Sequence, residues 1–119
     1  TNHPAPPGHC TGGAVDITII DSDGQELDMI SPLLPSQAQH THVNGLSSTA
    51  KANRMMLFDC MSAAGFSNCK DEYWHYSYGD SAYAVRTNQN SCCYGIVKLD
   101  ARPLDSSSKI RVFCFDCEC

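Results

Sequence analysis

Apolar and polar residues alternate along the run AVDITII, residues 14–20, which follows a pair of glycines. An alternation with a period of two residues is typical of a β-strand that buries one face. Residues 21–24 read DSDG, and Asp and Gly tolerate the positive φ angles of a tight turn. Residues 25–30 then form the return strand, so the sequence predicts a β-hairpin.

A long loop and a helix follow the predicted hairpin. Residues 31–48 contain two prolines and several Ser, Gln and His residues, which predict a loop that is functional or mobile. Apolar residues then recur at helical spacing, so we expect a helix that Ser48 or Thr49 caps and that runs to about Ala64. Gly65 supplies its C-terminal stop.

Three aromatic or β-branched runs occupy the second half of the chain, at residues 72–78, 82–86 and 94–99. Gly, Asp and Asn residues separate them, which predicts a meander of antiparallel strands. One more strand is expected at residues 109–115. The predicted fold class is therefore α+β, an antiparallel sheet with one main helix packed on one face.

The bulk composition indicates one domain spanning residues 1–119, with the proline-rich residues 1–8 as an extended lead-in. The net charge is −5 and the eight Lys and Arg residues form no basic stripe, so no nucleic-acid partner is expected. No apolar run reaches the roughly 18–20 residues of a membrane span, so no membrane insertion is expected. No signal peptide is visible. The localisation, cytoplasmic or periplasmic and secreted, and the oligomeric state stay open.

The chain contains eight cysteines, which are Cys10, Cys60, Cys69, Cys92, Cys93, Cys114, Cys117 and Cys119. The even number permits disulfides if the chain is secreted, but their absence from residues 11–59 is unlike a compact disulfide scaffold. Three of them lie in the C-terminal tail, residues 100–119. These three could bind a metal as thiolates, although disulfides or free thiols are the commoner outcome.

Two short segments, HCTGGAVD and EYWH, concentrate the side chains that bind metals. A catalytic zinc site takes three protein ligands and keeps a fourth position for water, whose pKa falls to about 7. His9, Asp16 and His75 fit the ligand set, and Glu72 fits the general base that removes the proton of the water. Each residue alone is a weak signal, and their combination carries the prediction.

The spacing of Glu72 and His75 constrains the local structure. Residues three apart on a regular strand point to opposite faces of a sheet. We therefore predict a turn or bulge at Glu72 and Tyr73, with His75 on the strand proper. Trp74, between the expected base and ligand, is a candidate for substrate binding, and ordinary packing is the alternative.

The same segments resemble a known family. HCTGGAVDITIIDSDGQELDM closely resembles the metal-binding segment of the D-alanyl-D-alanine dipeptidases, which have the pattern His-x-x-Gly-x-Ala-x-Asp and are related to zinc D,D-carboxypeptidases. EYWHYSYGDSAYA resembles their Glu-x-Trp-His segment, and NRMMLFDCMSAAGF resembles the helix before it. The resemblance covers roughly residues 7–97, and the two motifs in this order are specific.

The resemblance implies a zinc-dependent peptidase with a mixed sheet-and-helix fold. By its motifs, His9, Asp16 and His75 become the ligands of a Zn²⁺ cofactor and Glu72 becomes the catalytic acid and base. The implied substrate is a small peptide, D-Ala-D-Ala or a related cell-wall dipeptide.

The sequence also departs from the family pattern. Pro7 stands where the family has a serine, and Met29 is followed by Ile30 instead of the usual glycine. The family's arginine upstream of the first ligand has no counterpart in this chain. Two alternatives therefore stay open, a non-catalytic zinc-binding module and a D,D-carboxypeptidase or endopeptidase that acts on longer muropeptides. His40 and His42 could form a second metal site, but a solvated loop is the commoner interpretation.

Overall fold

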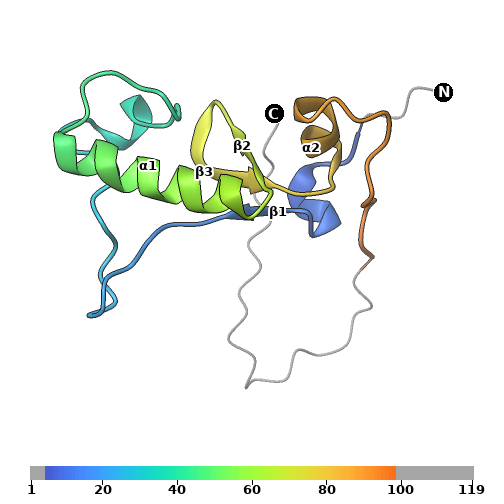
Figure 1. Ribbon diagram of the computed structural model, residues 1–119, viewed down its shortest axis with the longest axis horizontal. Helices are drawn as coiled ribbons and strands as arrows, with labels where there is room; N and C mark the ends of the chain where they lie inside the picture. Colours follow the sequence, from blue (N-terminus) through green and yellow to red (C-terminus); the bar gives the residue numbers. More distant parts are fainter. Residues whose placement is uncertain (1–4, 99–119) are drawn as a thin grey trace.

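The computed structural model describes residues 5–98 and has the α+β fold that the sequence predicts (Figure 1). One long helix runs beside a small antiparallel sheet, and a short helix lies at the opposite end of the sheet. In chain order the elements are η1 (Gly8–Thr11), β1 (Ala14–Asp16), η2 (Pro35–Gln37), α1 (Ser48–Ala63), β2 (Ser67–Cys69), β3 (Glu72–Ser77) and α2 (Ser81–Arg86), where η marks a 3-10 helix.

The sheet has three strands in the order β1–β3–β2, and both pairings are antiparallel. In the register of β1 and β3, Asp16 lies directly opposite His75. On the other side of β3, the register shifts between Asn68 and Cys69. The predicted irregularity beside Glu72 is thus confirmed, and it takes the form of a bulge in the pairing with β2.

The helix α1 forms where helical spacing predicts it. Its N-cap is Ser47, one residue before the predicted candidates, and the Ser47 hydroxyl oxygen accepts a hydrogen bond from the backbone N–H of Ala50 at 3.1 Å. A cap of this kind satisfies one of the backbone donors that a helix start leaves free. At the other end, Gly65 has φ +90°, a left-handed conformation that ends the helix as predicted.

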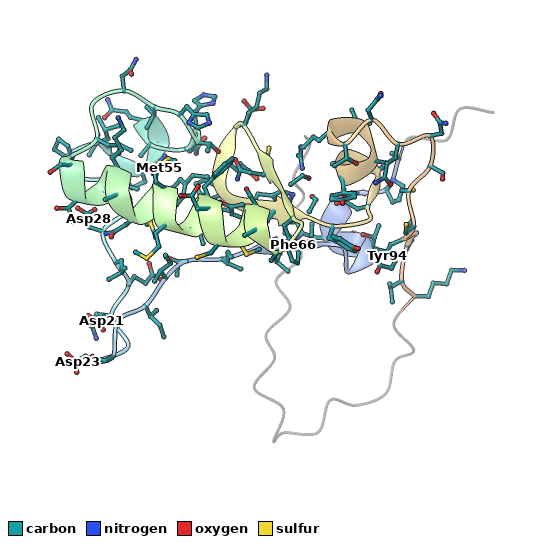
Figure 2. The ribbon with its side chains drawn as sticks, viewed as in Figure 1. Asp21, Asp23, Asp28, Met55, Phe66 and Tyr94 are labelled. Atoms are coloured by element: carbon teal, nitrogen blue, oxygen red, sulfur yellow. The ribbon has the colours of Figure 1, made fainter. Side chains whose placement is uncertain are left out.

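The hydrophobic core lies between α1 and the sheet. Its fully enclosed members are Met29, Leu57 and Tyr76. Burial raises the pKa of the Tyr76 hydroxyl to about 12. Partly buried side chains complete the core, namely Ile17, Ile19, Leu27, Ile30, Met61, Phe66 and Tyr73. Figure 2 shows Phe66 beside the C-terminal end of α1, where the chain turns into β2.

A buried arginine of α1 organises the long loop. The guanidinium of Arg54 donates hydrogen bonds to the backbone carbonyls of Met29 at 2.6 Å and His40 at 2.8 Å, and also to that of Ala38. It also lies over the Tyr73 ring, 3.9 Å from the ring centroid. The loop therefore follows a fixed path between α1 and β3.

The predicted hairpin is only partly confirmed. The strand β1 ends at Asp16, and the two arms beyond it meet at a single bridge between Ile20 and Glu26. The turn itself forms as predicted, because the Asp21 carboxylate accepts the backbone N–H groups of Asp23 and Gln25 at 2.9 Å. Figure 2 shows this turn at the tip of an arm that extends away from the sheet. The arm gains no further strand partner among residues 5–98, so the hairpin stays short.

The predicted meander is wrong after β3. Residues 82–86 belong to the helix α2 and not to a strand. The reason is the preceding Asp80, whose carboxylate accepts the backbone N–H of Tyr83 at 2.7 Å and caps a helix that two alanines favour. Residues 94–98 form no strand and are exposed. The strand β2 was not predicted, because it has only three residues.

Two further expectations concern the ends of the chain and the membrane. The predicted strand at 109–115 and the cysteines of the tail lie outside the described residues. Of the cysteines that are described, Cys60, Cys92 and Cys93 are free and exposed. Within residues 5–98, every helix is too short or too polar to cross a membrane.

Candidate metal centre

The first histidine of the site lies on η1, which folds back over the end of the sheet. The Thr11 hydroxyl donates to the Gly8 carbonyl at 2.6 Å and accepts the Gly13 backbone N–H at 3.0 Å. Gly12 has φ +71°, where a side chain would be strained. This compact turn places His9 above β1.

Close packing against the start of α2 holds the same turn. A Cβ atom on Gly8 would lie 2.3 Å from Oδ2 of Asp80, so only glycine fits there. Asp80 is fully buried, and its Oδ2 makes no hydrogen bond within the described part of the chain. The other oxygen caps α2 through Tyr83. One carboxylate therefore joins α2 to the turn that carries His9.

Three potential ligands converge at the end of β1. Since Asp16 and His75 are opposed across two antiparallel strands, their side chains leave the same face of the sheet side by side. Nδ1 of His75 lies 3.1 Å from Oδ1 of Asp16, and Nε2 of His9 lies 3.3 Å from the same oxygen. The two imidazole rings meet edge to face with centroids 4.8 Å apart. The three ligand atoms all lie within 4.8 Å of one another.

Glu72 joins this cluster from the bulged end of β3. Its Oε2 lies 3.7 Å from Nδ1 of His75. On an uninterrupted strand these two side chains would face opposite sides of the sheet. The irregular pairing with β2 therefore lets a carboxylate and an imidazole three residues apart reach one site.

The second nitrogen of His75 has its own partner. Nε2 lies 3.3 Å from the hydroxyl oxygen of Ser77, a fully buried residue two positions along the strand. Burial lowers the pKa of His75, while the neighbouring Asp16 carboxylate acts in the opposite direction. In the absence of a metal, Nδ1–H can donate to the Asp16 carboxylate, which only accepts, and Nε2 can then accept from the Ser77 hydroxyl. A metal ion on Nδ1 would take the place of that proton, and Nε2–H would then donate to the Ser77 oxygen.

The donor set fits zinc. Two ligands of a tetrahedral zinc ion, each about 2.0–2.2 Å from the metal, lie about 3.4 Å apart. The contacts of 3.1 and 3.3 Å around Asp16 agree with that spacing. Nε2 of His9 is buried and lies 3.3 Å from Oδ1 of Asp16 without a hydrogen bond among the described residues, so a metal ion would satisfy this nitrogen. Two imidazoles and one carboxylate suit zinc better than the oxygen-binding cations.

The cluster opens into a cleft of about 990 Å³ between η1, the β2–β3 turn and α2. His9 and His75 form part of its wall, and Lys70, Asp71 and Arg86 bring charge to its other parts. Trp74 does not line this cleft, and its ring packs edge to face on Tyr73 with centroids 4.9 Å apart. The structure thus brings His9, Asp16, His75 and Glu72 together and gives Trp74 a packing contact.

Two residues around the site escaped the sequence reasoning. Ser77 carried a usable signal, because residues two apart on a strand share a face and Ser77 follows His75 by two. Asn68, whose side-chain amide contacts the backbone carbonyl of His75, carried no such signal. Its contact depends on the irregular register of β2 and β3, which a local sequence pattern does not reveal. His40, considered for a second site, contacts Asp71 at the surface and is joined by no third ligand among residues 5–98.

Comparison with known proteins points to one family. Residues 1–93 match the family described as D-ala-D-ala dipeptidase. The chain is 35% identical over 101 residues to a D-alanyl-D-alanine dipeptidase of Synechocystis sp. (strain ATCC 27184 / PCC 6803 / Kazusa), a match that covers 74% of this chain and 41% of that protein. It is 30% identical over 86 residues to a D-alanyl-D-alanine dipeptidase of Escherichia coli (strain K12), covering 71% and 45%. The chain thus spans less than half the length of these relatives. No solved structure matches it significantly.

Proposed function

This chain belongs to the D-Ala-D-Ala dipeptidase family, and from that membership we propose that it is a zinc peptidase that cleaves a short peptide, D-Ala-D-Ala or a related cell-wall dipeptide. The observation that carries the proposal is the convergence of His9, Asp16 and His75 on one point beside Glu72. Four residues from both family motifs meet there although 59 positions separate Asp16 from His75.

In the proposed site, His9, Asp16 and His75 hold the zinc ion. When bound, zinc would act as a Lewis acid that polarises a peptide carbonyl and lets water react near neutral pH. With zinc on Nδ1 of His75, the Ser77 oxygen would accept from Nε2–H and hold the ring in that orientation. The His75 side chain is buried and that of His9 is largely shielded, which limits competing water.

Glu72 is the proposed general base. Its carboxylate lies 3.7 Å from a ligand nitrogen, within reach of a water molecule at the site. We propose that it takes the proton of the attacking water and then gives that proton to the leaving amine. Both steps need a carboxylate held beside the ligands and partly shielded from solvent, and the Glu72 side chain is 23% exposed.

The decisive experiment combines the metal content of the purified protein with D-Ala-D-Ala hydrolysis in the presence and absence of a chelator. We expect about one zinc ion per chain and turnover that the chelator removes. Glu72→Gln should keep the zinc and lose about 100-fold or more in kcat, the scale of general-base catalysis. Glu26→Gln, on the exposed arm, is the matched control and should leave both unchanged. Zinc with no turnover in the wild type would favour a non-catalytic binding module.

The size of the cleft favours a second candidate, cleavage of longer muropeptides. A volume of about 990 Å³ lies at the upper end of ligand pockets and exceeds what one dipeptide fills. Comparing kcat/KM for D-Ala-D-Ala with that for a pentapeptide ending in D-Ala-D-Ala separates the two candidates.

A further inference from the structure

The bulge beside Glu72 leaves part of β3 without backbone partners on β2. Asn68 pairs with Tyr76, and the next residue of β2, Cys69, pairs with Glu72. One step along β2 therefore corresponds to four steps along β3, and residues 73–75 have no register partner there. Backbone carbonyls in such a stretch need another donor, because a buried polar group without a hydrogen bond is unfavourable.

The side chain of Asn68 supplies that donor. Its amide nitrogen Nδ2 lies 3.0 Å from the carbonyl oxygen of His75, 3.3 Å from that of Glu72 and 3.4 Å from that of Tyr73. One carboxamide thus contacts the backbone carbonyls of both the proposed base, Glu72, and a proposed ligand, His75. The residue is half-buried, so these bonds are partly protected from water.

The backbone carbonyls of β3 orient this amide, because they only accept and therefore require Nδ2 to face them. The Thr41 hydroxyl lies at the other end of the amide, 2.6 Å from Oδ1 of Asn68 and 2.8 Å from the carbonyl oxygen of Cys69. Its single hydrogen can be donated to either oxygen. The Thr41 backbone N–H also donates to the Lys70 carbonyl at 3.0 Å, which ties the loop to the β2–β3 turn.

We propose that Asn68 is a positioning residue that sets the relative placement of Glu72 and His75. By holding the bulge closed, its amide turns the Glu72 carboxylate toward the face on which His75 lies. Without it, the strand would relax toward regular pairing, in which the two side chains diverge. The proposal rests on the proposed zinc peptidase function for its catalytic readout, whereas its structural readout is independent.

The test compares Asn68→Ala with Asn53→Ala. Asn53 is the matched control, because its side-chain amide also donates to a backbone carbonyl, that of Asp28 at 2.9 Å, far from the ligands in the fold. Both variants should lose similar thermal stability. Only Asn68→Ala should lose zinc affinity and kcat, each by about 10-fold to 100-fold, the range found when a partner that orients a ligand is removed. KM should change less than kcat, since Asn68 is one of many residues that line the cleft and the others are retained.

If the Asn68→Ala protein does not fold, a pair of variants at Thr41 tests the same interaction without changing Asn68. Thr41→Val removes the hydroxyl with little change of shape, and Thr41→Ser retains it. We expect Thr41→Val to reproduce the loss of zinc affinity in part and Thr41→Ser to restore the wild-type value. Equal zinc affinities in the Asn68→Ala and Asn53→Ala proteins, or equal values for Thr41→Val and Thr41→Ser, would overturn the proposal.

Crystal structures of the Asn68→Ala and Asn53→Ala proteins separate this proposal from the proposed function. The distance from Glu72 Oε2 to His75 Nδ1, now 3.7 Å, should lengthen in the first and stay unchanged in the second. If the wild type binds no zinc, the proposed function fails while these distances still decide the role of Asn68. If the distance is unchanged in Asn68→Ala, Asn68 does not position the pair.

Discussion

Two histidine–aspartate pairs in this molecule have the same separation and very different surroundings. Nε2 of His9 lies 3.3 Å from Oδ1 of Asp16, and Nδ1 of His40 lies 3.3 Å from Oδ1 of Asp71. The side chains of the first pair are 11% and 36% exposed, and those of the second pair 65% and 57%. A short contact alone therefore does not define a metal site.

The first pair differs in what surrounds it. His75 approaches the same Asp16 oxygen from the opposite strand at 3.1 Å, and Ser77 holds the far side of its ring. The elements that carry these residues are paired strands and a turn packed on α2. His40 lies on the long loop instead, and no third ligand joins it within the described residues. Convergence from several fixed elements distinguishes the candidate site from a surface ion pair.

Removal of one imidazole from each region should give the largest difference in zinc affinity. His75→Ala takes away one of three proposed ligands, so we expect zinc affinity to fall by more than about 100-fold, beyond the loss found when only a partner of a ligand is removed. His40→Ala should leave it unchanged. Competition with a chromogenic chelator measures both affinities. If the two variants lose equal zinc affinity, the two histidine–aspartate pairs do not differ in metal binding.

The packing under His9 gives the next largest effect. In Gly8→Ala, the added Cβ would approach Asp80 Oδ2 to 2.3 Å and Ala14 Cβ to 3.0 Å. Overpacking of this kind lowers the free energy of unfolding by about 1–3 kcal/mol, and displacement of the turn should also weaken zinc binding. Gly95→Ala, where the added atom meets nothing within 4 Å, is the control.

Chemical denaturation of both glycine variants, with and without zinc, measures these effects. The Gly8→Ala protein should gain less stability from added zinc than the Gly95→Ala protein, because a ligand that binds the folded state more tightly stabilises it more, with the logarithm of its affinity. Equal gains would show that the turn does not position His9.

Loss of the hydroxyl beside His75 should have a smaller effect. Ser77→Ala removes the partner of Nε2 while Nδ1 still faces Asp16. We expect zinc affinity to fall by about 10-fold, the lower end of the range for such partners. Ser62→Ala, on the exposed surface of α1, is the control and should bind zinc as the wild type does. Isothermal titration of both proteins decides, and equal affinities would remove Ser77 from the site.

The contrast between the two regions also explains what the sequence could predict. The residues of the candidate site were predictable because their types and order form two specific motifs. The long helix was predictable because apolar residues at helical spacing bury one face. Both signals are local in the chain, and each survives small errors in the boundaries of the elements.

Features that depend on distant contacts were not predictable. The aromatic and β-branched residues at 82–86 suggested a strand, but the cap at Asp80 and the packing on Gly8 favour a helix. The support of the bulge by Asn68 requires the register between two strands, which no local pattern specifies. For the same reason, the sequence raised His40 as a candidate ligand although its surroundings keep it at the surface.

The smallest effect concerns an exposed carboxylate just before the long loop that carries His40. The Asp28 carboxylate accepts the backbone N–H groups of Ser31 at 2.9 Å and Ile30 at 3.1 Å, and these hydrogen bonds lower its pKa. Because the folded state lowers this pKa, the charged group stabilises the fold at pH values above its unfolded pKa of about 3.9. That contribution is lost as the pH falls through the lowered, folded value.

Asp28→Asn should therefore be slightly less stable than the wild type at neutral pH, and the difference should vanish in strong acid. Asparagine keeps an oxygen acceptor, so the variant tests the charge and not the hydrogen bonds. Asp71→Asn is the comparison, because an exposed ion pair contributes less than about 1 kcal/mol and salt screens it. Thermal unfolding from pH 2 to pH 7 measures both. If Asp71→Asn shows the larger loss at neutral pH, the loop is held by its imidazole–carboxylate pair, and the two histidine–aspartate pairs are more alike than their exposure indicates.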